Sequence, residues 1–142
     1  MSDDTFDRDD LCFVCGQQND GGLRLRPRSE EGRCVIEWVP ASRYQGYAGV
    51  LHGGVISTLF DEAMAHAALS VAGPSPTAGI SVEFVKPVAI GRPIRIEAAV
   101  KERRRRILRT EAELRQDGEV RARATGTFVA VRSADRRAGD AT

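Results

Sequence analysis

Two glycines stand directly before an apolar stretch that carries two adjacent acids. The glycines are Gly53 and Gly54, and the acids are Asp61 and Glu62. If the stretch is a helix, its first backbone N–H groups have no acceptor within the helix, and its dipole favours negative charge at that end. Small residues there let another molecule come close, so the helix start is suited to hold an oxyanion that forms during a reaction. Carboxylates on so apolar a helix are costly unless they are used or paired.

The spacing of apolar residues predicts that this stretch is a helix. Apolar residues follow an i, i+1, i+4, i+5 pattern, at Val55, Ile56, Leu59, Phe60, Ala63, Met64, Ala67, Ala68 and Val71. Gly73-Pro74 is typical of a helix end. A simpler interpretation of the two acids stays open, in which both face solvent, paired with arginines, and the glycines only allow tight packing.

Segments of alternating apolar residues predict five strands, one before the helix and four after it. They are the segment near 33–39, the segment with Ile80, Val82 and Phe84, the segment with Ile94, Ile96, Ala98 and Val100, the segment with Leu108, Thr110, Ala112 and Leu114, and 120–131. We expect the second and third strands to pair with each other in an antiparallel way, with residues 87–93 as the turn between them. Asp117-Gly118 predicts a hairpin between the last two strands. This order favours an α+β fold in which one long antiparallel sheet wraps around one central helix.

Several ordered motifs make the chain resemble a known family. They are Cys12-Phe13-Val14-Cys15-Gly16 followed by Asn19 and Gly22-Leu23, then Tyr44-Gln45-Gly46, His52-Gly53-Gly54, Asp61-Glu62-Ala63-Met64 and Val85-Lys86-Pro87. Over residues 11–131 the chain resembles the hotdog-fold thioesterases, in particular the small single-domain group related to the acyl-CoA thioesterases of the phenylacetic acid pathway. The resemblance implies the hotdog fold and hydrolysis of an acyl-CoA to a free acid and coenzyme A, with no metal or organic cofactor.

The resemblance also implies roles for individual residues. The backbone N–H of Gly53 would polarise the thioester carbonyl, and Asp61 would act either as nucleophile or as general base on water. Thr77 matches a hydroxyl that in relatives orients the attacking water from across the subunit interface. Gln45 or Gly46 stands where several relatives have an asparagine that holds the carbonyl or the water. In this family the active sites lie between the subunits of a homodimer, and dimers often pair into tetramers.

The neighbours of these residues allow alternative interpretations. His52 supports the glycine turn, contributes to the oxyanion site, or acts as a general base as in dehydratases of the same fold; we favour the first, because Asp61 already supplies a base. Gly54 belongs to the same turn, Glu62 is the next candidate for the base, and His66 is expected to pair with Glu62 one helical turn away. Two other functions stay open: a non-catalytic module that binds acyl-CoA, and an enoyl-thioester hydratase or dehydratase that depends on His52.

Cysteines and arginines form two further groups. Cys12 and Cys15 are a C-x-x-C pair, but a structural zinc site usually takes four ligands in two pairs, so we expect no metal and interpret these residues as small buried thiols. The basic run before residue 107 is either a solvated turn or, through Arg104, Arg105 and Arg106, a binding site for the phosphates of coenzyme A. Nucleic acid is not expected as a partner, because the net charge is only +1 and no aromatic residues interleave the run.

Length and composition predict one ordinary domain over residues 1–142, with mobile tails over 1–10 and 133–142. No apolar run free of charge approaches about 18 residues, the length of a membrane-spanning helix, and the first residues do not form a signal peptide. We therefore expect a cytoplasmic protein with reduced thiols and no membrane contact.

An open sheet has unpaired edges, which predicts a homodimer and, beyond it, a dimer of dimers. Trp38, Phe60 and Phe84 fit an acyl pocket or the core equally well, so the sequence does not identify the acyl group.

Overall fold

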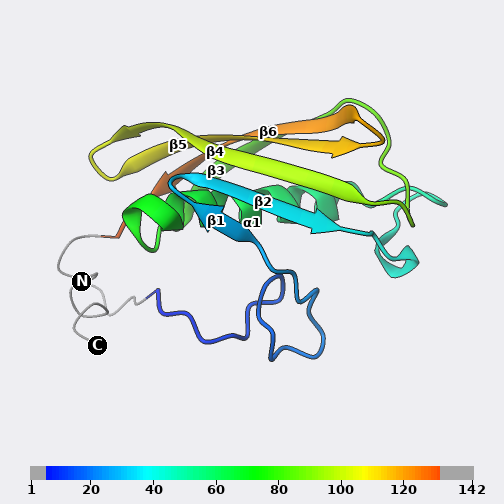
Figure 1. Ribbon diagram of the computed structural model, residues 1–142, viewed down its shortest axis with the longest axis horizontal. Coiled ribbons are helices and arrows are strands. Elements are labelled where there is room, and N and C mark those ends of the chain that lie inside the picture. The colour runs from blue at the N-terminus through cyan, green and yellow to red at the C-terminus, as the bar shows by residue number, and fades with distance from the viewer. Residues whose placement is uncertain (1–5, 132–142) are drawn as a thin grey trace.

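The computed structural model describes residues 6–131, so residues 1–5 and 132–142, which include most of the two expected tails, lie outside the described residues. Between residues 6 and 131 the chain forms one antiparallel six-stranded sheet and one α-helix that lies along it (Figure 1). In chain order the elements are β1 (Arg28–Glu30), β2 (Arg33–Trp38), the 3-10 helix η1 (Ser42–Tyr44), α1 (Gly53–Ala72), β3 (Thr77–Phe84), β4 (Ile94–Arg104), β5 (Ile107–Gln116) and β6 (Glu119–Val129).

The predicted helix is confirmed as α1, and so is its end. Gly73 follows its last residue with a φ of 73°, in the left-handed region that favours glycine, and Pro74 comes next. Helix α1 is long and apolar enough to cross a membrane, with a mean hydropathy of 1.2, but half of that apolar window is buried inside the fold. We therefore interpret α1 as the core helix of a folded domain.

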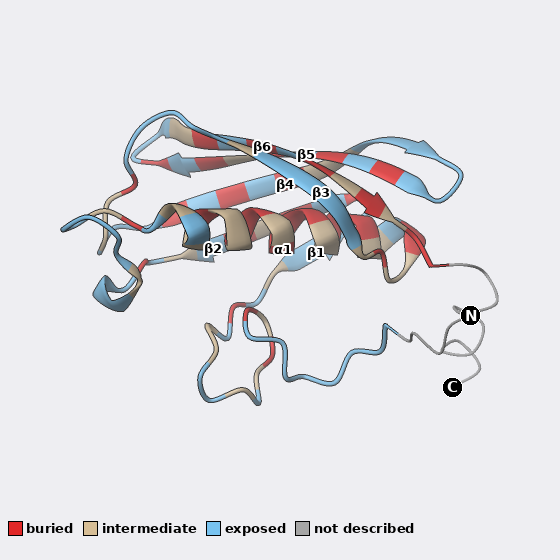
Figure 2. Ribbon diagram, turned by 180° about the vertical axis from the view of Figure 1, so that it is seen from behind, coloured by how far each residue is buried: buried red, intermediate tan, exposed pale blue. Residues whose placement is uncertain are grey.

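The inner face of the sheet packs on α1, and the alternation of buried and exposed residues predicted for the strands is confirmed in β2, β4, β5 and β6. It is not seen in β3, the edge strand, where Ile80 and Phe84 are exposed and Val82 is half-buried. Buried and exposed residues alternate along β4, β5 and β6 in Figure 2. Apart from Gln116, the buried positions of β2, β4 and β5 are those that the sequence pattern marks, namely Cys34, Ile36, Ile94, Ile96, Ala98, Leu108, Thr110, Ala112 and Leu114. The predicted α+β architecture, a long antiparallel sheet around one helix, is the one observed.

The pairing expected across residues 87–93 is wrong. The strands lie in the order β1-β2-β4-β5-β6-β3, so β3 pairs with β6, and β4 lies between β2 and β5. Residues 87–93 therefore connect two strands that are not neighbours. Alternation tells which face of a strand is buried but not which strands are adjacent, so the sequence pattern did not distinguish the two arrangements. Strand β1 was not predicted, because its three residues are all exposed and therefore show no alternation of apolar and polar residues.

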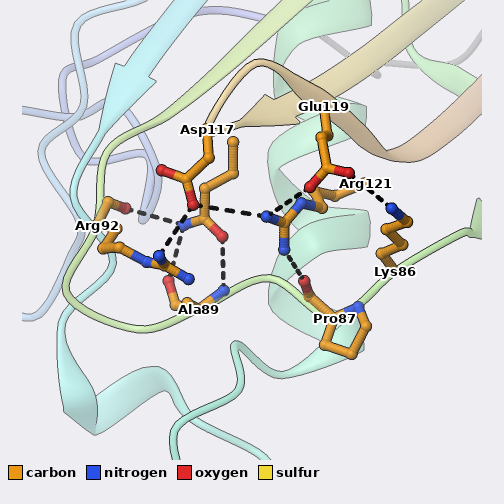
Figure 3. Close-up of polar contacts among 8 residues, drawn as sticks. Lys86, Pro87, Ala89, Arg92, Asp117, Glu119 and Arg121 are labelled. Atoms are coloured by element: carbon orange, nitrogen blue, oxygen red, sulfur yellow. Dashed lines mark hydrogen bonds and ion pairs between the residues drawn. The ribbon is translucent and has the colours of Figure 1, made fainter.

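The hairpin predicted at Asp117-Gly118 is confirmed, with φ values of 54° and 77° at its two residues. Beside it, Arg121 ties the hairpin to the connection that follows β3 (Figure 3). Its guanidinium donates to the Pro87 carbonyl at 2.7 Å and forms ion pairs with Asp117 and Glu119. These contacts fix the path of the connection between β3 and β4.

The buried Gln116 fixes the same connection further along the chain, at Ala89 and Arg92. Its side chain accepts a hydrogen bond from Ala89 N and donates to the carbonyls of Ala89 and Arg92. The neighbouring Val88 carbonyl accepts a hydrogen bond from Leu51 N at 2.8 Å. The loop that leads into α1 thus rests on a connection that β5 and β6 hold in place.

Candidate active site

Helix α1 begins with four backbone N–H groups, of which three have acceptors. His52 is the N-cap, and its Nδ1 accepts a hydrogen bond from Gly54 N at 2.8 Å. The His52 carbonyl accepts from Val55 N at 3.0 Å and from Ile56 N at 3.1 Å. The N–H of Gly53 has no acceptor among residues 6–131. It is therefore the donor at this helix end that remains free for a ligand.

Two aromatic rings enclose the glycine pair. A Cβ atom added at Gly54 would lie 3.1 Å from the ring of His52, and one added at Gly53 would lie 3.4 Å from the ring of Phe84. Phe84 ends β3 and is 54% exposed, so it is not a core residue, whereas Phe60 is fully buried. Of the aromatic residues considered for an acyl pocket, Phe84 is the one that lies beside Gly53.

The loop before α1 contains Gln45 and Gly46. The side chain of Gln45 accepts a hydrogen bond from Gly49 N at 3.0 Å, and its backbone pairs with Leu51. Gly46 donates to the Val50 carbonyl, and a Cβ atom there would lie 3.4 Å from His52. The Gln45 amide thus holds its own loop in shape, and Gly46 lets that loop pack closely on the N-cap residue.

Asp61 lies on the half-buried side of α1, where its carboxylate accepts a short hydrogen bond. Thr77 Oγ1, at the start of β3, donates to Asp61 Oδ1 at 2.6 Å. Both residues belong to one chain, so the hydroxyl that the resemblance places across a subunit interface lies beside the carboxylate of its own chain. The second carboxylate oxygen of Asp61 has no partner among residues 6–131.

The free N–H group and the carboxylate are far apart within one chain. Asp61 follows Gly53 by eight residues of the same helix, which separates them by about 12 Å along the helix axis. A thioester carbonyl and the water that attacks it lie within about 3.5 Å of each other. Within one chain, therefore, this N–H group and this carboxylate cannot both contact the same reacting group.

Glu62 faces away from Thr77 into a separate cluster. It is 9% exposed, its Oε2 lies 3.0 Å from His66 Nε2, and its Oε1 lies 3.9 Å from Cys12 Sγ. Burial alone would raise the pKa of Glu62, but hydrogen bonds from His66 and Cys15 hold that pKa below its ordinary value. Burial, followed by the nearby Glu62 carboxylate, raises the pKa of the Cys15 thiol to about 12. The expected Glu62–His66 pair is confirmed.

The basic run lies at the other end of α1. Arg104 ends β4, Arg105 has a φ of 58° in the tight turn, and Arg106 precedes β5. All three are exposed. The adjacent Arg103 donates to the carbonyl of Val71, near the last residue of α1. Val71 is about 27 Å along the helix from Gly53, so Arg103 lies nearer to Asp61 than to Gly53.

Comparison with known proteins identifies the family. The sequence profile of the thioesterase superfamily matches residues 48–122, which include α1 and most of the sheet. The chain belongs to the thioesterase superfamily. A protein of Saccharolobus solfataricus named "Putative esterase" is 32% identical over 107 residues, which are 73% of this chain and 76% of that protein.

A second relative carries the name of an acyl-CoA-cleaving enzyme. "Acyl-coenzyme A thioesterase THEM4" of Xenopus laevis is 28% identical over 101 residues, which are 70% of this chain. The match spans 46% of the Xenopus protein, so this chain corresponds to less than half of it.

Several solved structures share the fold of this chain. A conserved protein of Pseudomonas aeruginosa is 32% identical, with a TM-score of 0.71 over 75% of this chain and 88% of its own. The phenylacetic acid degradation protein PaaI of Thermus thermophilus, solved as a mutant, is 23% identical, with a TM-score of 0.71 over 75% of this chain and 93% of its own. A Streptococcus mutans protein solved with acetyl CoA is 20% identical, with a TM-score of 0.71 over 75% of this chain and 88% of its own. The fold of this chain is the hotdog fold, as the sequence motifs imply.

Proposed function

We propose that this protein is an acyl-CoA thioesterase, in which Asp61 is the catalytic carboxylate and the Gly53 N–H is the oxyanion donor. The observation that carries the proposal is the 2.6 Å hydrogen bond from Thr77 to Asp61. It fixes one carboxylate oxygen and leaves the other free to act on a substrate or on water. Membership of the thioesterase superfamily supports the reaction class.

In the proposed reaction the Gly53 N–H and the positive end of α1 bind the thioester oxygen, which becomes negatively charged as the carbonyl is attacked. Asp61 removes a proton from water, whose oxygen forms a bond to the carbonyl carbon. The carbon–sulfur bond then breaks, and the coenzyme A thiolate leaves and takes up a proton. Direct attack by the Asp61 carboxylate, followed by hydrolysis of the resulting anhydride, remains the alternative role.

The two halves of the site are proposed to meet in a homodimer. Strand β3 starts beside Asp61, through Thr77, and ends beside Gly53, through Phe84. Its outer edge has no strand partner in the described sheet, and nearly all of β3 is exposed in Figure 2. Antiparallel pairing of two such edges about a two-fold axis places the Thr77 end of one strand near the Phe84 end of the other. Asp61 of one protomer then faces Gly53 of its partner.

Acyl-CoA is proposed as the substrate class because three observations support it. The Xenopus relative bears the name of an acyl-CoA thioesterase, and a structure with the same fold was solved with acetyl CoA. In addition, Arg104 and Arg105 have no ion-pair partner among residues 6–131. Their guanidinium groups are free to bind phosphate.

The experiment that tests the proposal is thiol release with a chromogenic reagent over a panel of aryl and C2 to C16 acyl-CoAs. Wild type should hydrolyse part of the panel, and Asp61→Asn should lower kcat by about two to four orders of magnitude while KM changes little. Glu62→Gln is measured beside it, because Glu62 is the other candidate for the base and faces the separate cluster. Full activity of Asp61→Asn would refute the assignment of the base. Acyl-CoA binding without hydrolysis by wild type would instead favour the binding module.

The two-protomer arrangement has its own test in mixed dimers of Asp61→Asn and Gly53→Pro chains. Each chain alone lacks one half of every site. A mixed dimer contains one intact site if the halves meet across the interface, so a one-to-one mixture should recover about a quarter of wild-type kcat. No recovery, with mixed dimers verified by two affinity tags, would place both halves within one chain.

A further inference from the structure

The cluster around Glu62 is not used by the proposed reaction, and it has the composition of a metal site. Cys12, Cys15 and Glu62 present two sulfur atoms and a carboxylate oxygen that all lie within 4.8 Å of one another. The expectation of no metal rested on a missing second pair of ligands. The fold brings one further ligand to the cysteine pair from 47 residues further along the chain, where α1 presents Glu62.

The distances fit a tetrahedral ion. Zinc holds sulfur at about 2.3 Å and carboxylate oxygen at about 2.0 Å, so neighbouring ligand atoms are about 3.5 to 3.8 Å apart. Cys12 Sγ and Glu62 Oε1 are 3.9 Å apart. Small side-chain movements are enough to close the three donors around zinc.

The backbone around the cysteines is shaped to present both sulfur atoms on one side. Val14 N lies 3.4 Å from Cys12 Sγ, and Gly16 N donates to the Cys12 carbonyl at 2.8 Å. A Cβ atom on Gly16 would lie 2.4 Å from Cys12 N, so this tight turn requires glycine at that position. The turn therefore brings both sulfur atoms of the C-x-x-C pair close to Glu62, as one shared metal ion requires.

The surroundings supply the remaining parts of a zinc site. His66 holds the other carboxylate oxygen, Glu62 Oε2, at 3.0 Å, as partners of a metal-bound carboxylate do. Arg8 lies 4.0 Å from Cys15 Sγ and offsets the negative charge of the ligands. The cluster opens onto a cavity of about 960 Å³ that is lined in part by Glu62, His66 and the two cysteines. Zinc and a water molecule can enter from that side.

We propose that Cys12, Cys15 and Glu62 bind one Zn²⁺ ion, with a water from the cavity as the fourth ligand and His66 holding the carboxylate in place. The ion would fasten the segment before β1, which has no helix or strand between residues 6 and 27, onto α1. The site is separate from Asp61 and Thr77, so zinc binding and thioester hydrolysis can each be tested without the other.

The test is metal analysis of the full chain, purified without chelators, followed by titration of the metal-free protein with Zn²⁺ and with Co²⁺. Wild type should hold about one zinc per chain, and Co²⁺ should give the sulfur-to-cobalt charge-transfer band of a thiolate site. Cys12→Ser, Cys15→Ser and Glu62→Gln should each weaken zinc binding by about 100-fold or more. Cys34→Ala, which removes the third cysteine, should bind zinc like wild type.

Circular dichroism of each variant separates loss of zinc from loss of fold. A folded wild type that binds zinc more weakly than about 1 µM would overturn the proposal, as would unchanged affinity in Cys12→Ser. A Cys12–Cys15 disulfide in the freshly purified, unreduced protein, detected by mass spectrometry, would also overturn it.

Discussion

Replacement of Gly53 by proline removes the proposed oxyanion donor while sparing the helix. Gly53 is the first residue of α1, a position where proline is favoured because its missing N–H has no helical acceptor. His52, the residue before it, has a φ of −62° and a ψ of 133°, which is the conformation that a following proline prefers. The Gly53 N–H has no acceptor among residues 6–131, so no intramolecular hydrogen bond among them is lost.

The matched control is Gly53→Ala, which keeps the N–H group. Alanine and proline both add a Cβ atom that lies 3.4 Å from the ring of Phe84, so both variants move that ring by a similar small amount. The difference in kcat between the two variants therefore measures the contribution of the N–H donor alone. Removal of one oxyanion-hole donor costs about 100-fold to 1,000-fold in kcat, or roughly 2.7 to 4 kcal/mol of transition-state stabilisation.

The assay is steady-state hydrolysis of the best acyl-CoA from the panel, with thermal unfolding of each variant measured in parallel. We expect Gly53→Pro to lose about two to three orders of magnitude in kcat relative to Gly53→Ala, with similar unfolding temperatures. A kcat for Gly53→Pro within about threefold of the alanine variant, in folded protein, would refute the assignment of this N–H as the donor.

Three further predictions follow from other parts of the structure. Thr77→Val should lower kcat by about 10-fold to 100-fold, because the carboxylate loses its 2.6 Å hydrogen bond, whereas Thr77→Ser should keep most of the activity in the same kinetic assay. Arg104→Glu with Arg105→Glu should raise KM for acyl-CoA by about tenfold but leave KM for the corresponding acyl-pantetheine unchanged, since that substrate lacks the nucleotide phosphates. Burial raises the pKa of the Cys34 thiol from 9.0 to about 12, so the folded state keeps a proton that the unfolded state loses, and the free energy of unfolding should fall between these pH values. Chemical denaturation across that pH range should show a smaller fall for Cys34→Ala.

The sequence was sufficient to predict the helix and the five longer strands, but not the short strand β1 or which strands are neighbours in the sheet. The apolar spacing from Val55 to Val71 correctly predicted the helix, and Asp117-Gly118 correctly predicted a hairpin, because both patterns depend only on residues close together in the chain. The position of β3 at the sheet edge depends on β4 being enclosed by β2 and β5, which is a matter of long-range pairing. Local alternation carries no information about it.

The candidate site likewise combines features that the local sequence predicts with contacts that only the fold shows. The helix start and its glycines were visible in the sequence, since capping and dipole effects act within one turn. The contact of Thr77 with Asp61 depends on how the chain returns along α1 after Gly73, and the approach of Cys12 to Glu62 joins segments 50 residues apart. The sequence marked Glu62 as unusual, because an acid on an apolar helix is costly unless it is used or paired. Only the fold shows that the side chains beside it are two thiols and His66.

The length of α1 and the direction of β3 together explain why a protein of this design would need two copies for catalysis. A straight helix separates Gly53 from Asp61 by about 12 Å, and no side-chain rotation brings a backbone N–H group across that distance. Strand β3 runs back along the helix, so its two ends mark the two half-sites, and its exposed edge contains Ile80 near the middle. An antiparallel pair of such edges buries that edge and joins opposite half-sites through the same contact. Under this arrangement a substitution that keeps the chain folded but monomeric, such as Ile80→Lys, abolishes hydrolysis although it touches neither Gly53 nor Asp61.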